Sequence, residues 1–333
     1  MLTQPQYETL LQVLCKMLNT IITGASYESA SLKGGTVGDV RLITGVAQSA
    51  SGETVPYKLV LKIQKKWARW GDPDSWRREY DLYMSCLAET FTDTFTWPRC
   101  YHGQLYENET QLWMEYVEGV AGNDLTTPML AKAAYELGKY QGRLHNNPAI
   151  KNITNLHTKD AREIHYRHWK PKNLEYSYIR ESDCPIPKHL RDMIIDVDAR
   201  ANDIFSRIKQ LPEVICHRDY WTANIISAGG IYAIDWDSTG WGYLGEDIIS
   251  LITDETNPAL WAEYKARLIP AYLKGIVENM DIKGLDVSIF SDMALTSGYM
   301  YVHNFMHEKS PEGKEYYLLE LQQLYETFAE HVV

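Results

Sequence analysis

The sequence predicts an α+β protein, with β-strands in its first third and α-helices in most of the remainder. The stretch Tyr57–Ile63 alternates in polarity, so that Leu59, Leu61 and Ile63 fall on one face of a strand. Later stretches instead repeat a mostly apolar face at helical spacing. These positions are Leu130, Ala134, Leu137, Gln141 and Leu144, followed by Leu190, Ile194, Val197, Ala201, Ile204 and Ile208.

Length and composition permit two lobes. A chain of 333 residues with 45% hydrophobic and 12% aromatic content can bury a sizeable core. The strand-like residues 111–117 are followed by the segment Gly119–Asp124, which is the clearest boundary between two lobes. We therefore expect an N-terminal lobe over residues 1–118 and a C-terminal lobe over residues 119–333.

The chain has the features of a cytoplasmic protein. No stretch approaches the roughly 20 apolar residues that a membrane-spanning helix needs. The N-terminus, MLTQPQYETLLQ, has neither a basic nor an apolar leader region. Five scattered cysteines without a C-x-x-C pair predict reduced, mostly buried thiols, with neither a disulfide framework nor a zinc site.

The net charge of −11 argues against nucleic acid as the main partner, because phosphate backbones are bound by basic surfaces. The negative charge is concentrated from Asp219 onward, where 18 acidic residues accompany only 6 basic ones. This third of the chain is either solvated helix surface or an electrostatic trap for a cationic substrate.

A glycine-rich segment at residues 33–38 precedes a strand-like stretch at residues 40–46. Its Gly34, Gly35 and Gly38 free the backbone amides to wrap phosphate groups, although a pair of glycines is more often only a turn. The segment is therefore a weak indication of a nucleotide site.

Lys62 shares the second face of the predicted Tyr57–Ile63 strand with Val60. A lysine there either extends its ammonium group to solvent or reaches nucleotide phosphates. Asp74 can cap a following helix of about a dozen residues that presents Glu79 as an ion-pair partner. The charged run around Glu79 is otherwise ordinary for a solvated helix face.

The other elements follow from the same rules. Residues 5–19 form an amphipathic helix, and residues 99–106 and 111–117 form two more strands. Residues 166–178 are polar and aromatic and ambiguous in type, and we interpret them as a loop over the site. From Ile248 onward the chain is helical.

A cluster of oxygen-bearing side chains follows the apolar strand Val214–Cys216. Asp219 and Asn224 come after that strand, and Asp235 follows a hairpin whose turn is Gly229–Gly230. We expect these three side chains to share one small volume. Such oxygens, together with substrate phosphates, are what Mg²⁺ binds, and the order is the pattern of phosphoryl transfer.

These residues resemble the aminoglycoside phosphotransferase and choline kinase family of small-molecule kinases, which has the bilobal protein-kinase-like fold. The resemblance spans essentially the whole chain. It is strongest in His217-x-Asp219-x-x-x-x-Asn224, Ile234-Asp235-Trp236-Asp237 and Gly245-Glu246-Asp247-Ile248, whose order and spacing together are specific.

The resemblance implies an ATP- and Mg²⁺-dependent transfer of phosphate to a hydroxyl group. Asp219 would be the catalytic base, and Asn224 and Asp235 would be the metal ligands, with Asp237 as a second metal contact. His217 and Asp247 would brace the catalytic loop without moving protons themselves.

The resemblance also implies a nucleotide site in the first lobe. Lys62, paired with Glu79, would hold the α- and β-phosphates, and Val60 lies on the same strand face. The backbone of Met114–Val117, including Glu115 and Val117, would hydrogen-bond adenine.

Arg218 departs from the family, which usually has glycine there, and matches the protein kinases, in which this arginine anchors a phosphorylated loop. Only eleven residues separate Asp235 from Asp247, which leaves little room for such a loop and favours a small-molecule acceptor. A cationic amino alcohol or aminosugar suits the acidic last third, with Asp254, Glu255 and Glu308 as candidates for the substrate wall. The aromatic residues of this third either offer cation–π contacts or form core.

Two alternatives remain on the sequence alone. A non-catalytic nucleotide-binding or coat-type protein of the same fold would be expected to lack Lys62, Asp219, Asn224 or Asp235, and all four are present. A protein kinase would need a longer segment after Asp235.

Overall fold

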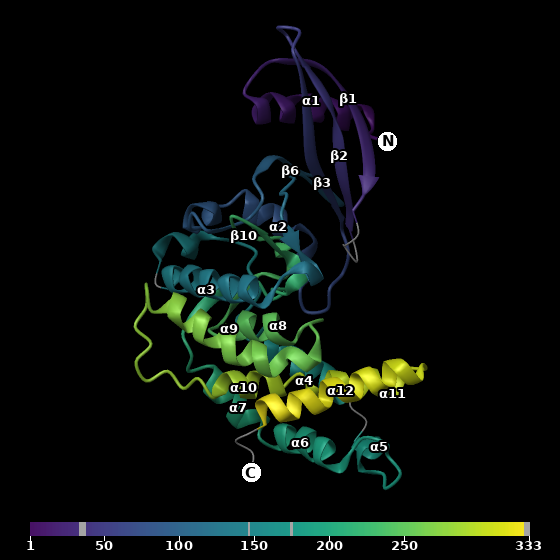
Figure 1. Cartoon of the computed structure of the whole chain (residues 1–333), viewed down its shortest axis with the longest axis vertical. Helices are drawn as coiled ribbons and strands as arrows, with labels where there is room; N and C mark the ends of the chain where they lie inside the picture. The colour runs from purple at the N-terminus through teal and green to yellow at the C-terminus, as the bar shows by residue number, and fades with distance from the viewer. Residues whose placement is uncertain (33–37, 146, 174–175, 330–333) are drawn as a thin grey trace. The chain divides into compact units, whose positions relative to one another are not determined.

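The computed structural model describes residues 1–32, 38–145, 147–173 and 176–329, and these form two compact units (Figure 1). The first unit comprises Met1–Val120, Pro148–Leu156 and Ile226–Ser238. The second comprises Ala121–Asn147, His157–Ile225 and Thr239–Val333. The antiparallel sheet in the N-terminal part and the helices of the C-terminal part confirm the predicted α+β class. The functional division at residues 118 and 119 stays a prediction.

A five-stranded antiparallel sheet of order β1-β2-β3-β6-β5 is the main element of the first unit. Its strands are β1 (Ile22–Ser31), β2 (Gly38–Ser49), β3 (Thr54–Lys65), β5 (Cys100–Leu105) and β6 (Glu109–Glu115). Helix α1 (Gln4–Leu18) lies beside this sheet, and its Leu10 and Leu14 pack with Leu59 and Leu61 (Figure 1). These two leucines of β3 are fully buried, which leaves Lys62 on the other face, as the alternation predicts.

Helix α2 (Ser75–Tyr83) has nine residues and is shorter than predicted. Asp74 precedes it, but the Asp74 side chain makes no capping hydrogen bond, so that prediction is wrong. The reason is local geometry, because Asp74 has φ −99° and ψ 6°, whereas a capping side chain is normally carried by extended backbone.

A second sheet of order β4-β10-β9-β7 contains the predicted hairpin. Its strands are β4 (Phe95–Thr96), β7 (Val120–Ala121), β9 (Ile225–Ala228) and β10 (Gly230–Ala233). Gly229 forms the turn at φ 77°, a left-handed conformation that glycine adopts without steric cost. The hairpin leads directly to Asp235.

Helices make up most of the second unit. They are α3 (Thr127–Leu144), α4 (Ala161–Asn173), α5 (Tyr176–Arg180), α6 (Lys188–Ala199), α7 (Ala201–Ile208), α8 (Glu246–Thr253), α9 (Trp261–Ile276), α10 (Ile289–Leu295), α11 (Gly298–His307) and α12 (Pro311–Phe328). Strands β8 (Glu213–Cys216) and β11 (Gly240–Tyr243) pair antiparallel. The short 3-10 helices of the two units are η1 (Cys86–Thr90), η2 (Gly122–Asp124), η3 (Pro148–Asn152), η4 (Thr222–Asn224), η5 (Trp236–Ser238) and η6 (Pro258–Leu260).

Helices α3 and α9 lie side by side, and their backbones approach each other closely (Figure 1). A Cβ atom on Gly138 would lie 2.1 Å from the carbonyl oxygen of Tyr272, and one on Gly275 would lie 2.0 Å from that of Tyr135. Only glycine fits at both positions, so close packing of these two helices accounts for the glycines within an otherwise helical pattern.

The loop expected at residues 166–178 is wrong, because α4 covers residues 166–173 and α5 begins at residue 176. Tyr166 is buried with its ring 5.3 Å from that of Phe205 and 5.6 Å from that of Tyr299. Helix α4 is anchored by this one buried aromatic side chain, which a search for aliphatic periodicity does not find. The cysteine prediction is also corrected, since Cys216 is buried but the other four thiols are only half-buried.

Within the described residues, no helix is both long enough and apolar enough to cross a bilayer.

Candidate active site

In the first unit, Lys62 of β3 lies between two carboxylates. Its Nζ atom is 2.5 Å from Oε2 of Glu79 on α2 and 2.7 Å from Oδ1 of Asp235. Lys62 is 8% exposed and Glu79 7%. The lysine therefore pairs with Glu79, as the sequence indicates, and with Asp235 as well.

The ionisation of this cluster follows from burial and charge. Burial alone would lower the pKa of Lys62, but Asp235 and Glu79 outweigh it and raise the pKa above its ordinary value. Burial raises the pKa of Glu79, and the negative charge of Asp235 adds to the effect, although Lys62 opposes it. Lys62 is therefore a fixed positive charge in the first unit.

The structure describes only some of the other residues that are predicted to contact the nucleotide. Val60 shares the β3 face with Lys62 and pairs with Met114 of β6. Glu115 ends β6, where its carboxylate accepts a hydrogen bond of 3.1 Å from the backbone N–H of Arg99, and Val117 follows. Gly34 and Gly35 lie outside the described residues, whereas Gly38 begins β2 opposite Gln64.

In the second unit, Asp219 and Asn224 form a hydrogen-bonded pair after β8. The Asn224 Nδ2 atom donates to Oδ2 of Asp219 at 2.7 Å and to its carbonyl oxygen at 2.9 Å. Both bonds use the amide nitrogen, so the amide carbonyl, which is the oxygen suited to a metal ion, is not used in them. Helix η4 carries Asn224 and brings it back to Asp219 five residues later.

Asp247 of α8 braces the backbone before Asp219. Its carboxylate accepts from the backbone N–H groups of His217 at 2.9 Å and Arg218 at 2.8 Å. Gln141 of α3 also donates to it at 2.8 Å. These contacts are consistent with the predicted bracing role of Asp247, which stays a prediction. The sequence had placed Gln141 on the apolar face of its helix, and a polar residue on such a face is the signal that it has a buried partner.

The His217 side chain is buried, and its ring packs edge-on against that of Tyr220 at 5.9 Å. This buried position is consistent with the bracing role of His217, which stays a prediction.

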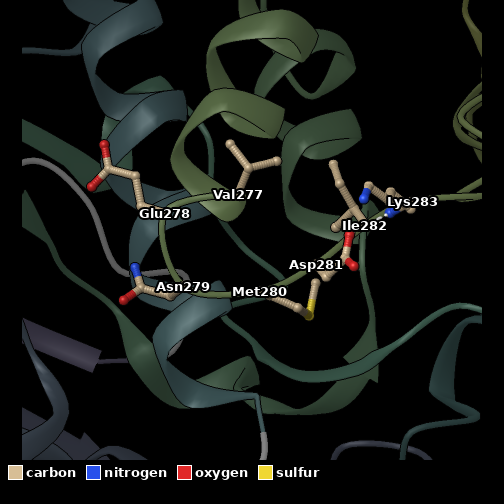
Figure 2. Close-up of a pocket in the computed structure, with 7 residues that line it drawn as sticks. All are labelled: Val277, Glu278, Asn279, Met280, Asp281, Ile282 and Lys283. Atoms are coloured by element: carbon tan, nitrogen blue, oxygen red, sulfur yellow. Dashed lines mark hydrogen bonds between the residues drawn. The ribbon is translucent and has the colours of Figure 1, made fainter.

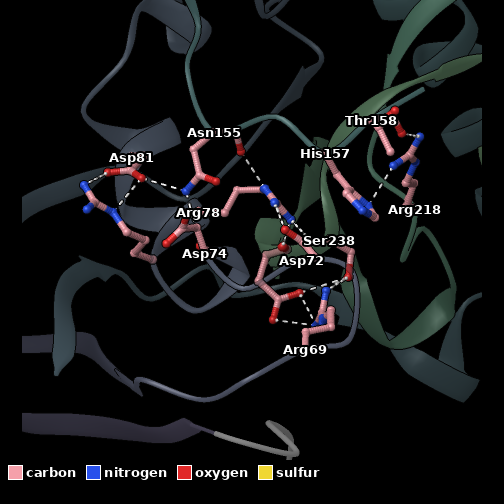
Figure 3. Close-up of polar contacts among 12 residues, drawn as sticks. Arg69, Asp72, Asp74, Arg78, Asp81, Asn155, His157, Thr158, Arg218 and Ser238 are labelled. Carbon is pink, nitrogen blue, oxygen red and sulfur yellow. Dashed lines mark hydrogen bonds and ion pairs between the residues drawn. The ribbon is translucent and has the colours of Figure 1, made fainter. Parts of the chain in front are cut away.

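Arg218 has φ 65°, the left-handed region that favours glycine. Its guanidinium contacts Nδ1 of His157 at 3.1 Å and donates to the carbonyl oxygen of Thr158 at 2.8 Å (Figure 3). It also donates to the carbonyl oxygen of Trp241 and lies 3.6 Å from Glu246. These contacts bind the arginine within its own unit, and they explain how a non-glycine residue is held in this conformation.

The candidate substrate residues lie near the ends of α8 and α11. Asp254 accepts hydrogen bonds from the hydroxyls of Ser250 and Thr253, and Glu255 is exposed at φ 48°. Glu308 accepts from the backbone N–H groups of Lys309 and Ser310, each at 2.7 Å, so it stabilises the turn before α12.

The sequence did not identify Glu320 of α12. It is 6% exposed, and its Oε2 atom has no hydrogen-bond partner among the described residues. Burial raises the pKa of Glu320 to about 7, a hydrogen bond from Tyr316 opposes this, and the negative charges of Asp254 and Glu255 reinforce it. Asp254, Glu255 and Glu320 thus form one acidic group. The aromatic residues Trp261 and Tyr301 beside it are buried.

The sequence also missed three charged residues of the first unit. Arg69 donates to Asp237 at 3.2 and 3.3 Å, so Asp237 is ion-paired in this structure. Arg78 and Asp72 form a buried ion pair beside Glu79.

A surface hollow of about 690 Å³ lies in the second unit at the loop after α9 (Figure 2). It is lined by Val277–Lys283, and the labelled side chains come from this one loop. None of the predicted site residues lines it, so the chemistry is not expected there.

The fold, an antiparallel sheet in the N-terminal part followed by a helical C-terminal part, is that of the protein-kinase-like small-molecule kinases. The model of the phosphotransferase enzyme family matches residues 65–281, and the chain belongs to this family. The predicted resemblance is thereby confirmed. No curated protein sequence shows significant similarity to the chain.

Solved structures are similar at low sequence identity. A choline/ethanolamine kinase family protein of Mesorhizobium loti is 15% identical with a TM-score of 0.54, and the match covers 98% of this chain and 97% of that chain. APH(2″)-IIa in its gentamicin complex is also 15% identical with a TM-score of 0.54, over 99% and 98%. An ethanolamine kinase of Plasmodium vivax is 17% identical with a TM-score of 0.51, over 89% and 81%. At these identities the likeness shows the fold alone.

The buried carboxylate of Asp247 gives a prediction on pH. Burial raises the pKa of Asp247 to about 6, although hydrogen bonds from the backbone N–H groups of Arg218 and His217 lower it. The negative charge of Glu246 adds to the rise, and the positive charge of Arg218 opposes it. Because the carboxyl has a higher pKa in the folded protein than in the unfolded chain, its protonated form stabilises the fold. This contribution to stability is complete below about pH 4 and is lost as the pH rises through about 6. Relative to Asp247→Asn, the wild type should lose about 3 kcal/mol of unfolding free energy over this window.

Urea denaturation of both proteins at intervals between pH 4 and pH 7.5 measures this difference. Two curves that run parallel across the window would show that Asp247 does not titrate there.

Proposed function

We propose that this protein transfers the γ-phosphate of ATP, with Mg²⁺, to a hydroxyl group of a small cationic molecule. The observation that carries the proposal is Lys62, a buried and permanently charged ammonium group between Glu79 and Asp235. Positioning and neutralisation of charge account for most of phosphoryl transfer, so a fixed cation beside a carboxylate is the arrangement expected for a phosphate site.

In the proposed reaction, residues 1–118 handle the nucleotide and residues 119–333 the acceptor. Lys62 binds the α- and β-phosphates, and Glu79 holds the ammonium group in place. Asp219 accepts the proton of the acceptor hydroxyl as the bond to phosphorus forms, and Asn224 keeps that carboxylate oriented through its amide. A cytoplasmic location, where ATP is available, is part of the proposal.

The donor set suits Mg²⁺. Asn224 and Asp235 offer hard oxygen ligands, and within the described residues no group of three or more His, Cys, Asp or Glu side chains forms a ready metal cage. A magnesium ion would therefore be held by one or two protein oxygens together with phosphates and water, which is its usual arrangement. When bound, it supplies neutralisation of the phosphate charge.

The acidic group of Asp254, Glu255 and Glu320 supports a cationic acceptor. A buried carboxyl oxygen without a partner is costly, and an ammonium group would satisfy it with a charge-assisted hydrogen bond. Solved proteins of the same fold carry names that include choline/ethanolamine kinase and ethanolamine kinase, and one was solved with gentamicin. An amino alcohol or aminosugar is the acceptor class that fits both observations.

A panel of acceptors tests the proposal. Purified protein with ATP and Mg²⁺ should phosphorylate at least one aminoglycoside or choline-like alcohol and none of the matched neutral sugar alcohols. Glu320→Gln should raise the acceptor KM by about tenfold, the loss of one charge-assisted hydrogen bond, without changing the KM for ATP. Glu315→Gln, on the exposed face of the same helix, is the matched control.

Faster turnover of the neutral acceptors would reject a cationic substrate. Binding of ATP with Mg²⁺ but no turnover of any acceptor would favour the non-catalytic alternative, and phosphorylation of a generic protein alone would favour a protein kinase.

A further inference from the structure

Asp235 has a strained backbone. Its φ of 66° lies in the left-handed region, although it is neither glycine nor in a turn that requires it. Such conformations persist where the surrounding structure determines them, and they cluster at functional sites. The residues that hold the chain on either side of Asp235 therefore decide where its carboxylate lies.

Arg78 of α2 holds the chain just after Asp235. Its guanidinium donates to both carboxylate oxygens of Asp72, at 2.5 and 2.7 Å, and to the carbonyl oxygen of Asp237 at 2.7 Å. Its Nε atom donates to the carbonyl oxygen of Asn155 at 2.6 Å (Figure 3). Arg78 is 1% exposed and Asp72 5%, so these bonds are made in the interior of the first unit.

Arg69 holds the same segment from the connection between β3 and α2. It donates to the carboxylate of Asp237 at 3.2 and 3.3 Å and to the hydroxyl of Ser238 at 2.9 Å (Figure 3). The backbone N–H of Asp72 donates to the carbonyl oxygen of Arg69 at 3.1 Å, so the two arginines and Asp72 belong to one folded segment.

This arrangement also fixes Glu79. Glu79 follows Arg78 directly on α2, and its Oε1 atom is 3.4 Å from the backbone N–H of Trp236, the residue between Asp235 and Asp237. A displacement of η5 (Trp236–Ser238) would therefore move both carboxylates that hold Lys62.

Stability alone does not explain such a pair. A buried ion pair is often no more stabilising than a well-packed apolar pair of similar volume, and its value lies in the one geometry that it permits. Only a guanidinium has the planar array of donors that binds one carboxylate and two separate carbonyl groups at once.

We propose that Arg69, Asp72 and Arg78 form a latch, defined by these three residues, that positions Asp235 and Glu79 for phosphoryl transfer. The latch makes Asp237 a positioning residue that is bound to Arg69. This inference rests on the proposed function, because it assigns Asp235 its role toward Mg²⁺ and the phosphates.

The test is the double variant Asp72→Leu/Arg78→Met, which replaces the ion pair with apolar side chains of similar size and is expected to fold. Isothermal titration measures the affinity for ATP with and without Mg²⁺, and urea denaturation measures stability. We expect the enhancement of ATP affinity by Mg²⁺ to fall about 10-fold or more, as when a residue that orients a metal ligand is removed. Turnover should fall about 100-fold, the effect of a misplacement near 1 Å.

Two single variants separate positioning from charge. Arg78→Lys keeps the charge, but its three donors are on a single nitrogen and cannot reproduce the planar array through which Arg78 makes four hydrogen bonds to Asp72, Asp237 and Asn155. It should therefore lose the Mg²⁺ enhancement as the double variant does. Arg77→Met, which removes the more exposed neighbouring arginine that pairs with Asp81, should behave as the wild type.

The outcomes distinguish the two proposals. If the wild type itself shows no Mg²⁺-dependent binding of ATP, the proposed function fails. The latch is rejected if the wild type shows Mg²⁺-dependent binding and the folded double variant keeps both the Mg²⁺ enhancement and the turnover. It is also rejected if Arg78→Lys keeps both. If the double variant does not fold, Arg69→Met tests the latch instead, because the Arg69–Asp237 pair is partly exposed. We expect this variant to lose about 10-fold of the Mg²⁺ enhancement.

Discussion

Replacing Asp219 with asparagine should lower kcat by about 1,000-fold, within the range of a lost general base, and leave the Kd for ATP within about threefold of the wild-type value. Asparagine keeps the size of the side chain and an oxygen that can still accept from Nδ2 of Asn224, so the local structure should persist. What it cannot do is accept the proton of the acceptor hydroxyl. Steady-state kinetics and calorimetric titration of ATP measure the two quantities.

Asp203→Asn provides the control, because Asp203 is an exposed aspartate of α7 in the same unit. Its turnover should equal that of the wild type. Turnover by Asp219→Asn within about tenfold of the wild-type value would remove Asp219 from the role of general base, since such a base contributes at least about 100-fold.

The sequence predicted those features that depend on local pattern. Alternation in β3 is sufficient to put Lys62 opposite the core, and the spacing from Asp219 to Asn224 is sufficient for their pairing, because a short 3-10 helix returns the chain over this distance. The hairpin before Asp235 follows from two glycines between apolar strands.

The sequence failed where a charged residue is buried against a distant partner. Arg78 lies in a run of charges that is typical of a solvated helix face, yet it is among the most buried side chains of the chain. Its partners Asn155 and Asp237 are remote in sequence, and no periodicity reports them. A weak signal existed, since Arg78 is four residues before the buried Leu82 and so shares its helix face.

Position 218 combines both cases. The departure from glycine is visible in the sequence, but its meaning is not, because the left-handed backbone and the contacts with His157, Thr158 and Trp241 are set by tertiary structure. A phosphorylated loop is not needed to engage Arg218, because its own unit already does.

Lys62→Met should abolish measurable phosphotransfer and also destabilise the protein, for a separate reason. Loss of the ammonium group leaves the buried carboxylate of Glu79 and the half-buried carboxylate of Asp235 without their cation. Breaking such a pair costs about 3 kcal/mol of unfolding free energy, the low end of the range for a buried ion pair because Asp235 is partly exposed. The double variant Lys62→Met/Glu79→Gln removes the repulsion, so it should recover most of the stability and none of the phosphotransfer. Lys58→Met on the same strand, whose partner Glu118 is 82% exposed, should change stability by less than about 1 kcal/mol.

The pH dependence identifies the cause of the destabilisation in Lys62→Met. Lys62 opposes the rise in the pKa of Glu79, so without the lysine the pKa of this carboxyl rises further in the folded protein. The folded variant is therefore stabilised at low pH, and this stability is lost as the pH rises. The variant should therefore be closer to the wild type at pH 5 than at pH 8, as measured by urea denaturation. An equal deficit at both values would attribute the loss to packing around the methionine, and full phosphotransfer by either variant would exclude Lys62 from phosphate binding.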